Sequence, residues 1–407
     1  MGVRGLYKFI EQFCIKNEVN AFVNNNIENY KDKMMAIDVS HIIYRYGIGI
    51  RKSGKDKLSS SGEPVNHLYG MVCYIKFLIR NHIKPFFVFD GKSPTIKQNT
   101  VSDRKYRKLT ATNKCSELSD TSSDEYIKQF KRGYFLSDKN IKECQELLKD
   151  CGIPYMEAIN EAESQCAALV AKDKNFYGVV TEDIDASVFG TTKMLKNFKD
   201  GDNIIEISLS EILRVFLLEA NTIRTIKGLQ PLKKFGYYDF VNFVSMLETD
   251  YFNGVKTQNY YQLYEAYVIN NYDIHDMITY LEKNNIMILP EAFYENWENV
   301  NKYYIETEVN NPDLIDKNFH RPNFYMLYKI LTSYCGFEHH WVKDFCTELK
   351  YFHEYIQQKQ NPTITIKMNN KYDSNNTNIK TNTNDSTFNS FKSCAQKKQR
   401  ILQNGKY

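Results

Sequence analysis

The stretch Phe176-Tyr-Gly-Val-Val-Thr-Glu-Asp-Ile-Asp185 decides the fold class, because a short apolar run ends in a cluster of acids. Residues 176–180 predict a buried strand. Three other segments have the same form, at 34–39 (MMAIDV), 85–89 (PFFVF) and 153–156 (IPYM). Helical patterns at 67–80, 139–150 and 161–172 lie between these strands, and Gly152 is suited to end the second helix. Strands alternating with helices predict an α/β fold with a mostly parallel sheet flanked by helices.

The composition suits a globular protein of 407 residues with 42% hydrophobic residues. No uncharged apolar run is long enough for a membrane span, and the N-terminus lacks the features of a signal peptide, so we expect an intracellular protein. The net charge of +4 is too small to indicate a nucleic-acid partner by itself. None of the nine cysteines forms a C-x-x-C pair, which argues against a zinc site or a disulfide framework.

Five regions follow from changes in composition along the chain. Residues 1–97 and 139–285 are expected to build one core. The stretches 204–290 and 322–358 read as helical. Residues 98–138 are polar and charged and predict a partly helical insertion above the sheet. Residues 286–358 predict a helical C-terminal region, and the Asn-, Thr-, Ser- and Lys-rich tail 359–407 predicts disorder.

Acids follow every predicted strand. The set consists of Asp38, Asp90, Glu161, Glu163, Asp183 and Asp185. Because the carboxyl ends of parallel strands share one edge of a sheet, we expect these side chains to gather there. Clustered carboxylates repel one another, and hard divalent cations relieve that repulsion. Oxygen ligands without His or Cys favour Mg²⁺ or Mn²⁺, and a pair of such ions suits phosphodiester hydrolysis.

Each acid also has an ordinary structural interpretation. Asn160 and Glu163 fit a helix capping box, and Asp38 could cap the next helix. Asp90-Gly91 reads as a turn, while Asp183 and Asp185 could be solvated loop acids. No single site decides between these interpretations, but acids at all the strand ends together favour a metal site.

Five motifs resemble the flap endonuclease/XPG-type nuclease family. They are Met1-Gly-Val-Arg-Gly-Leu6, Ala36-Ile-Asp-Val-Ser40, Val88-Phe-Asp-Gly-Lys92, the segment 152–169 and Thr181-Glu-Asp-Ile-Asp-Ala-Ser-Val-Phe-Gly190. The resemblance runs from Met1 to about residue 285, is weaker in the insertion, and returns faintly near 322–352. It implies a PIN-like nuclease core in which residues 98–138 form an arch that a single 5′ strand threads.

The resemblance also implies site residues. Asp250 takes the place of a seventh metal-binding acid, and Lys97 and Arg104 match the basic pair that contacts the scissile phosphate. Tyr44 matches an aromatic residue that stacks on a base. Gly2 matches the small residue that lets the N-terminus approach the site once Met1 is removed. Lys105, Arg107 and Lys108 complete a basic helical face for DNA.

The chain departs from the family in the helix–two-turn–helix expected near 250–270. This segment reads Gly254-Val-Lys-Thr-Gln-Asn259, so Thr257 and Asn259 replace the glycines of the family's Gly-x-Gly, which binds duplex backbone and K⁺. Lys256 retains a phosphate contact in this interpretation. The tail lacks the family's sliding-clamp motif. These departures suit a divergent or viral member of the family. We expect the protein to act in the nucleus or, if it is viral, at a cytoplasmic replication site of the host cell.

The resemblance implies a divalent-metal-dependent, structure-specific 5′ flap endonuclease with 5′→3′ exonuclease activity. We expect two Mg²⁺ ions, replaceable by Mn²⁺, and a monomer that binds branched, flapped or nicked DNA and no membrane. A mainly exonucleolytic or junction-resolving enzyme is the first alternative. A catalytically inactive junction-binding protein is the second, although the full set of acids argues against it. A metal-dependent phosphatase would need a second Asp two residues after Asp38, where Ser40 stands.

Overall fold

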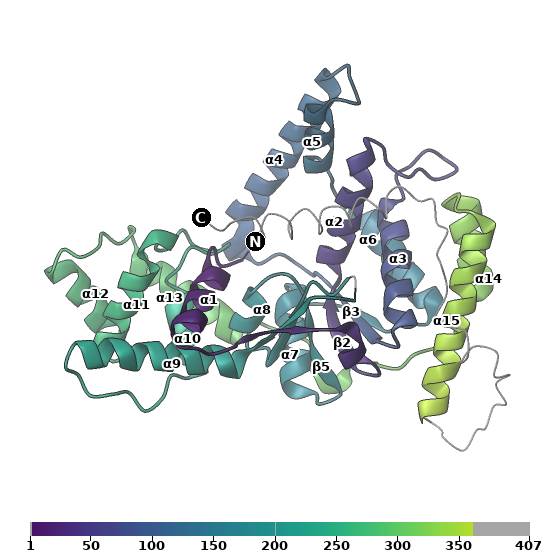
Figure 1. Ribbon diagram of the computed structural model, residues 1–407. Helices are drawn as coiled ribbons and strands as arrows, with labels where there is room; N and C mark the ends of the chain where they lie inside the picture. Colours follow the sequence, from purple (N-terminus) through teal and green to yellow (C-terminus); the bar gives the residue numbers. More distant parts are fainter. Residues whose placement is uncertain (1, 200, 361–407) are drawn as a thin grey trace, which may run out of the picture. The chain divides into compact units, whose positions relative to one another are not determined.

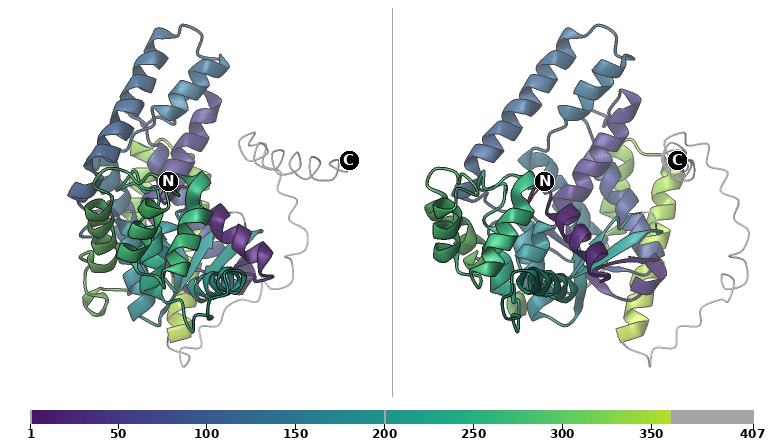
Figure 2. Two further views of the ribbon diagram at one scale, coloured as in Figure 1. Left: turned by 90° about the vertical axis from the view of Figure 1, so that its left-hand side faces the viewer. Right: turned by 60° about the vertical axis from the view of Figure 1, so that its left-hand side comes forward.

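A computed structural model describes residues 2–199 and 201–360 (Figures 1 and 2). The chain divides into two compact units, Met1–His353 and Glu354–Tyr407, and the sheet, the insertion and the acids all lie in the first. The strands are β1 (Phe22–Asn25), β2 (Met34–Asp38), β3 (Lys84–Phe89), β4 (Tyr155–Glu157), β5 (Phe176–Val180), β6 (Lys193–Lys196) and β7 (Ile204–Ser208). No helix in the described ranges is long and apolar enough to cross a membrane.

The helices connect and cover these strands. They are α1 (Leu6–Lys16), α2 (Val39–Ile50), α3 (Asn66–Arg80), α4 (Gln98–Glu117), α5 (Asp124–Arg132), α6 (Asp138–Cys151), α7 (Ala162–Lys172), α8 (Asp185–Val188), α9 (Leu209–Ile226), α10 (Tyr237–Val244), α11 (Tyr260–Ile269), α12 (Ile274–Lys283), α13 (Phe293–Glu306), α14 (Phe324–Lys329) and α15 (His339–Gln360). Short helical turns are η1 (Ile27–Tyr30), η2 (Arg51–Ser53), η3 (Thr95–Lys97), η4 (Thr257–Asn259), η5 (Pro312–Leu314) and the π turn η6 (Ile330–Tyr334).

The sheet has the strand order β1-β7-β6-β5-β2-β3-β4. Neighbours from β6 to β4 are parallel, whereas β7 runs antiparallel to both β6 and β1. In the centre, Ile37 of β2 is paired with Phe87 of β3 and with Val180 of β5. The three central strands therefore end at the same edge, and the loops that follow them meet there. The predicted α/β fold with a mostly parallel sheet is confirmed.

Helices bury both faces of the sheet, as the near-continuous apolar strands require. Ala36, Phe86 and Val88 face a core cluster that includes residues of α1, α7 and α9. On the opposite face, Tyr74 of α3 lies against Phe87, with ring centroids 6.4 Å apart. Successive side chains of β3 point to opposite faces of the sheet, as the two-residue period of a strand requires, and helices cover both faces.

The large core cluster depends on apolar stripes of helical spacing. In α1, Leu6, Phe9, Ile10 and Phe13 are buried on one side, and Phe13 packs edge-on against Phe216 of α9 with centroids 5.2 Å apart. Each such buried side chain contributes roughly 1.5–3 kcal/mol to stability. This packing holds α1 in place, and with it the residues that precede α1.

The insertion forms a helical pair, α4 and α5, whose helices contact each other (Figure 2). Few of its residues are buried; they include Ala111, Cys115 and Gln129. Arg51 of η2 anchors the pair, since its guanidinium donates to the Phe130 carbonyl at 2.9 Å and lies 4.2 Å from the Phe130 ring centroid. The prediction of a partly helical insertion at 98–138 agrees with this arrangement, except that Asp138 already begins α6.

Several boundary predictions were wrong. The sequence analysis did not predict the strands β1, β6 and β7, because each is short and contains polar residues. The prediction of helix throughout 204–290 was wrong at its start, where β7 pairs with β6 and β1. The strand predicted to reach Val39 ends at Asp38, and helix α15 continues to Gln360 rather than ending at 358. The predicted disordered tail from 361 onward lies outside the described residues.

Candidate active site

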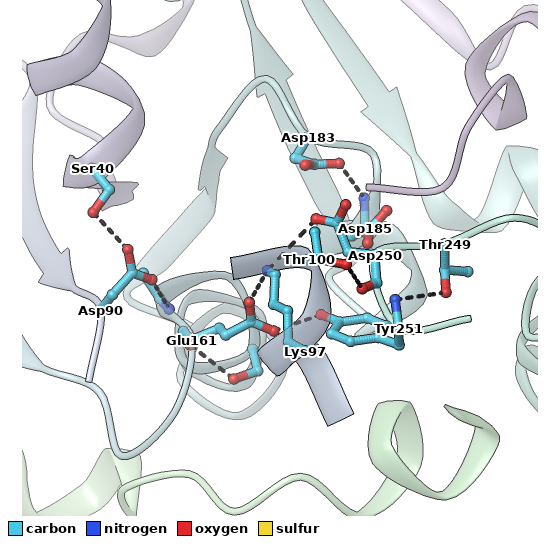
Figure 3. Close-up of polar contacts among 12 residues, drawn as sticks. Ser40, Asp90, Lys97, Thr100, Glu161, Asp183, Asp185, Thr249, Asp250 and Tyr251 are labelled. Carbon is cyan, nitrogen blue, oxygen red and sulfur yellow. Dashed lines mark hydrogen bonds and ion pairs between the residues drawn. The ribbon is translucent and has the colours of Figure 1, made fainter. Parts of the chain in front are cut away.

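The acids that follow the central strands come together at the carboxyl edge of the sheet (Figure 3). Asp38 ends β2, Asp90 follows β3, and Asp183 and Asp185 follow β5. The parallel register of these strands places them there, as the sequence predicted.

Asp38 and Asp90 are linked through the start of α2. Asp38 is buried, and its carboxylate accepts a hydrogen bond from the Ser40 backbone at 3.1 Å, so it caps α2. The Ser40 hydroxyl donates to Asp90 at 2.6 Å, and the backbone N–H of Ala162 donates to the other Asp90 oxygen at 2.9 Å. The capping interpretation of Asp38 is thus correct, and its second oxygen accepts a hydrogen bond from the Thr181 hydroxyl at 3.4 Å.

The predicted capping box at Asn160 and Glu163 is wrong. Helix α7 begins at Ala162, and its N-cap residue Glu161 makes no capping hydrogen bond with its own side chain. Asn160 instead donates to the Glu308 carbonyl at 3.1 Å. Asp90 accepts from the first amide of α7 instead, so neither glutamate side chain caps this helix.

Asp183 and Asp185 lie directly against the N-terminal residues. Asp185 is 2% exposed, and one of its oxygens accepts from the Val3 backbone at 2.7 Å. Gly2 has a φ of +79°, and a Cβ at this position would lie 1.9 Å from an Asp183 oxygen and 2.4 Å from an Asp185 oxygen. Only a residue without a side chain allows this close approach. The expectation that Gly2 lets the N-terminus reach the acids agrees with this geometry.

The basic pair contacts two of the acids. Arg104 of α4 donates to both oxygens of Asp250 at 2.7 Å. Lys97, whose side chain is 12% exposed, pairs with Glu161 and lies 3.7 Å from Asp250 (Figure 3). Glu161 and Glu163 also raise the pKa of Lys97 above its usual range, although burial opposes the shift. The resemblance therefore identified a basic pair that lies next to the acids.

Burial and mutual repulsion dominate the electrostatics of the remaining acids. Burial, with a further contribution from Asp90, raises the pKa of Asp38 to about 8. Burial also raises the pKa of Asp183, and burial together with the Asp183 charge raises those of Glu163 and Asp185 well above the usual range. Negative charge at these carboxylates is unfavourable until a cation is close.

The donor set fits hard divalent cations. Its ligands are carboxylate oxygens, and no lysine or arginine within the described ranges pairs with Asp38, Glu163 or Asp185. That part of the chain holds no group of three acidic, histidine or cysteine side chains already spaced as a metal site. Lys97 and Arg104 occupy oxygens of Glu161 and Asp250, so binding an ion would require these two acids to exchange one cationic partner for another.

The predicted DNA contacts lie in three places. Tyr44 of α2 is covered by Lys108 of α4, whose amino group donates to its hydroxyl at 2.8 Å and lies 4.3 Å from its ring centroid. Lys105 and Arg107 are exposed on α4. Lys256 follows Asp250 in the chain and is exposed.

In the segment that stands in place of the family's Gly-x-Gly, Gly254 packs closely against the chain's own backbone. A Cβ at Gly254 would lie 2.3 Å from the Met246 carbonyl oxygen, so this glycine is required by packing. Asn259 has a φ of −105° and precedes α11 as its N-cap. Asn259 therefore does not reproduce the left-handed backbone that glycine would permit.

Three tyrosines at the site were missed by the sequence analysis. Tyr251 and Tyr303 donate to Glu161, and Tyr304 donates to Asp185 at 3.1 Å. Tyr251 follows Asp250 in the chain, and that adjacency could have indicated it. Tyr303 and Tyr304 lie on α13, more than a hundred residues from the acids they contact, so no local pattern could have found them.

A sheet edge lined by acids, with a basic pair beside it, has the charges that a phosphodiesterase site needs. Comparisons with known proteins identify the family. Residues 1–111 match the XPG N-terminal domain and residues 152–230 match the XPG I-region. Flap endonuclease 1 of Drosophila yakuba is 32% identical over 338 residues, covering 83% of this chain and 81% of the relative. Flap endonuclease 1 of Nematostella vectensis is 30% identical over 340 residues, covering 83% and 84%. The chain belongs to the flap endonuclease/XPG-type nuclease family, as its motifs predicted.

Solved structures agree with this assignment. The catalytic core of Rad2 in complex with DNA substrate has a TM-score of 0.58 at 25% identity, covering 86% of this chain and all of that chain (100%). Flap endonuclease-1 from Methanococcus jannaschii has a TM-score of 0.59 at 24% identity, covering 82% and 97%, and shows the shared fold. The protein is therefore a nuclease, a hydrolase of phosphodiester bonds.

Proposed function

We propose that the protein is a divalent-metal-dependent, structure-specific 5′ flap endonuclease that also has 5′→3′ exonuclease activity. The main support for the proposal is that Lys97 and Arg104, where the helical insertion begins, contact acids of the site. The Flap endonuclease 1 relatives support the flap as substrate.

Two Mg²⁺ ions, or Mn²⁺ in their place, would be held by the seven acids Asp38, Asp90, Glu161, Glu163, Asp183, Asp185 and Asp250. When bound, such ions supply an activated water and stabilise charge on the phosphate, and hydrolysis would leave a 5′-phosphate. Lys97 and Arg104, already directed at the acids, would contact the scissile phosphate and orient it. Their move from carboxylate to phosphate oxygens would free Glu161 and Asp250 for the metal.

Substrate selection in this proposal depends on shape rather than on base sequence. Tyr44 would stack on the base beside the cut once Lys108 moves from its ring, and stacking tolerates any base. Lys105, Arg107, Lys108 and Lys256 would contact phosphates, so affinity should fall as salt rises. The pair α4–α5 would admit a single 5′ strand. We propose that the protein acts as a monomer on flapped, branched or nicked DNA in replication, repair or recombination, in the nucleus or at a viral replication site in the cytoplasm.

Single-turnover cleavage of a labelled 5′-flap duplex tests the proposal, with Mg²⁺, Mn²⁺, Ca²⁺ or EDTA present. A flap with a blocked 5′ end and a nicked duplex are the matched substrates. Cutting near the flap base with Mg²⁺ or Mn²⁺, absent in EDTA and reduced by the blocked end, supports the flap endonuclease. Preference for nicks and free ends would replace it with a mainly exonucleolytic enzyme. Tight flap binding without any cutting would replace it with a junction-binding protein.

A further inference from the structure

Two consecutive tyrosines of α13 reach two different acids of the site. The Tyr303 hydroxyl donates to Glu161 at 2.9 Å, and the Tyr304 hydroxyl donates to Asp185 at 3.1 Å. Neighbouring residues on a helix point about 100° apart. One helix thus spans acids that follow different strands. Helix α13 lies outside both stretches that match the family models, 1–111 and 152–230.

The hydroxyls are held rigidly. Tyr304 is 2% exposed and packs against Phe189 and Tyr251, with ring centroids 5.0 and 5.5 Å apart. Tyr303 packs against Tyr251 with centroids 4.9 Å apart. Tyr304 is buried and Tyr303 is half-buried, and close packing leaves such rings few alternative rotamers, which favours the observed direction of each hydroxyl.

Helix α13 is itself fixed to the core. The Trp297 indole N–H donates to the Asn242 carbonyl of α10 at 2.9 Å, and the Asn301 amide donates to the Asn242 side chain at 2.8 Å. Val300 is buried between these contacts. The helix is therefore a stable support for the two hydroxyls.

We propose that Tyr303 and Tyr304 are positioning residues that hold Glu161 and Asp185 in the orientation needed to bind the divalent ions. This inference rests on the proposed metal-dependent function. A phenylalanine would fill the same space, but it could not donate to a carboxylate. Both oxygens of Asp185 accept hydrogen bonds, one from the Val3 N–H and the other from the Tyr304 hydroxyl. Loss of an outer hydrogen bond to a metal ligand typically weakens metal binding by about 10–100-fold.

The test measures Mn²⁺ binding by the full-length, DNA-free protein with titration calorimetry. Tyr303→Phe and Tyr304→Phe remove the hydroxyls, and Tyr264→Phe is the matched control. Tyr264 is fully buried and donates at 2.7 Å to the Phe216 carbonyl, away from the acids. We expect Tyr304→Phe to lose about 10–100-fold in Mn²⁺ affinity. Tyr303→Phe should lose less, because the Tyr251 hydroxyl still donates to Glu161. The control should bind Mn²⁺ as the wild type does, even if it unfolds at a lower temperature.

The outcomes separate this inference from the proposed function. Wild-type protein that binds Mn²⁺ while Tyr303→Phe and Tyr304→Phe bind it equally well would overturn the positioning role and leave the nuclease proposal standing. The same weakening in Tyr264→Phe would also overturn it, since the effect would then be general loosening. Wild-type protein that takes up no Mn²⁺ without DNA would overturn the positioning role, and only if it also cuts no flap with Mn²⁺ present would the nuclease proposal fall with it. Recovery of flap cleavage by the α13 variants at higher Mg²⁺ would support the positioning role further.

Discussion

Replacing Gly2 by alanine should slow flap cleavage by roughly 100-fold, because the added carbon would enter the space of two acids. The new Cβ would lie 1.9 Å from the nearest Asp183 oxygen, and real Cβ contacts essentially never fall below 3.0 Å. Either the N-terminal backbone or Asp183 must therefore move by at least about 1.1 Å, the difference between these distances. A misplacement of about 1 Å at a catalytic group can reduce a rate by about 100-fold.

The assay is the single-turnover cleavage rate of a 5′-flap duplex in saturating Mg²⁺. Gly228→Ala is the matched control, since Gly228 has a φ of +68° and nothing lies within 4 Å of an added Cβ. Both variants carry backbone strain of about 1–2 kcal/mol, but only Gly2→Ala has a steric conflict with the acids. Residues near a terminus can shift without global unfolding, so Gly2→Ala should keep a near-wild-type unfolding temperature. A Gly2→Ala rate within two-fold of wild type would falsify this reasoning.

Three further substitutions test individual roles. Asp183→Ala should abolish cleavage while leaving flap binding largely intact; equal loss of binding and folding would show Asp183 to be structural. Lys97→Ala should reduce the single-turnover rate more than flap affinity, and an unchanged rate would remove Lys97 from the catalytic role. Glu163→Gln removes a half-buried carboxyl whose negative charge is disfavoured by its acidic neighbours, so it should abolish cleavage yet stabilise the metal-free protein by about 0.5–2 kcal/mol. A calorimetric scan in EDTA measures this gain as a rise of a few degrees, and a lower unfolding temperature would contradict it.

Short-range patterns in the sequence determined the centre of the fold. The strands at 34–38 and 176–180 are apolar, short and followed by acids, and each of these features depends only on neighbouring residues. The parallel arrangement follows from the helices between the strands, and it brings the carboxyl ends together without further information. Asp38, Asp90, Asp183 and Asp185 could therefore be placed at one edge of the sheet from the sequence alone. The family motifs added Lys97, Arg104 and Asp250, which local chemistry by itself would not have distinguished from surface charges.

Tertiary structure alone decided the contacts between distant segments. Edge strands such as β1 owe their conformation to pairing with β7, so their own sequence carries little signal. Glu163 fits a capping box by spacing, yet Asp90 from another loop takes the first amide of α7, and the box does not form. Tyr304 reaches Asp185 only because α13 packs on α10. Local propensity sets which segments become strands and helices, whereas a hydrogen bond between residues more than a hundred positions apart exists only after the core has packed.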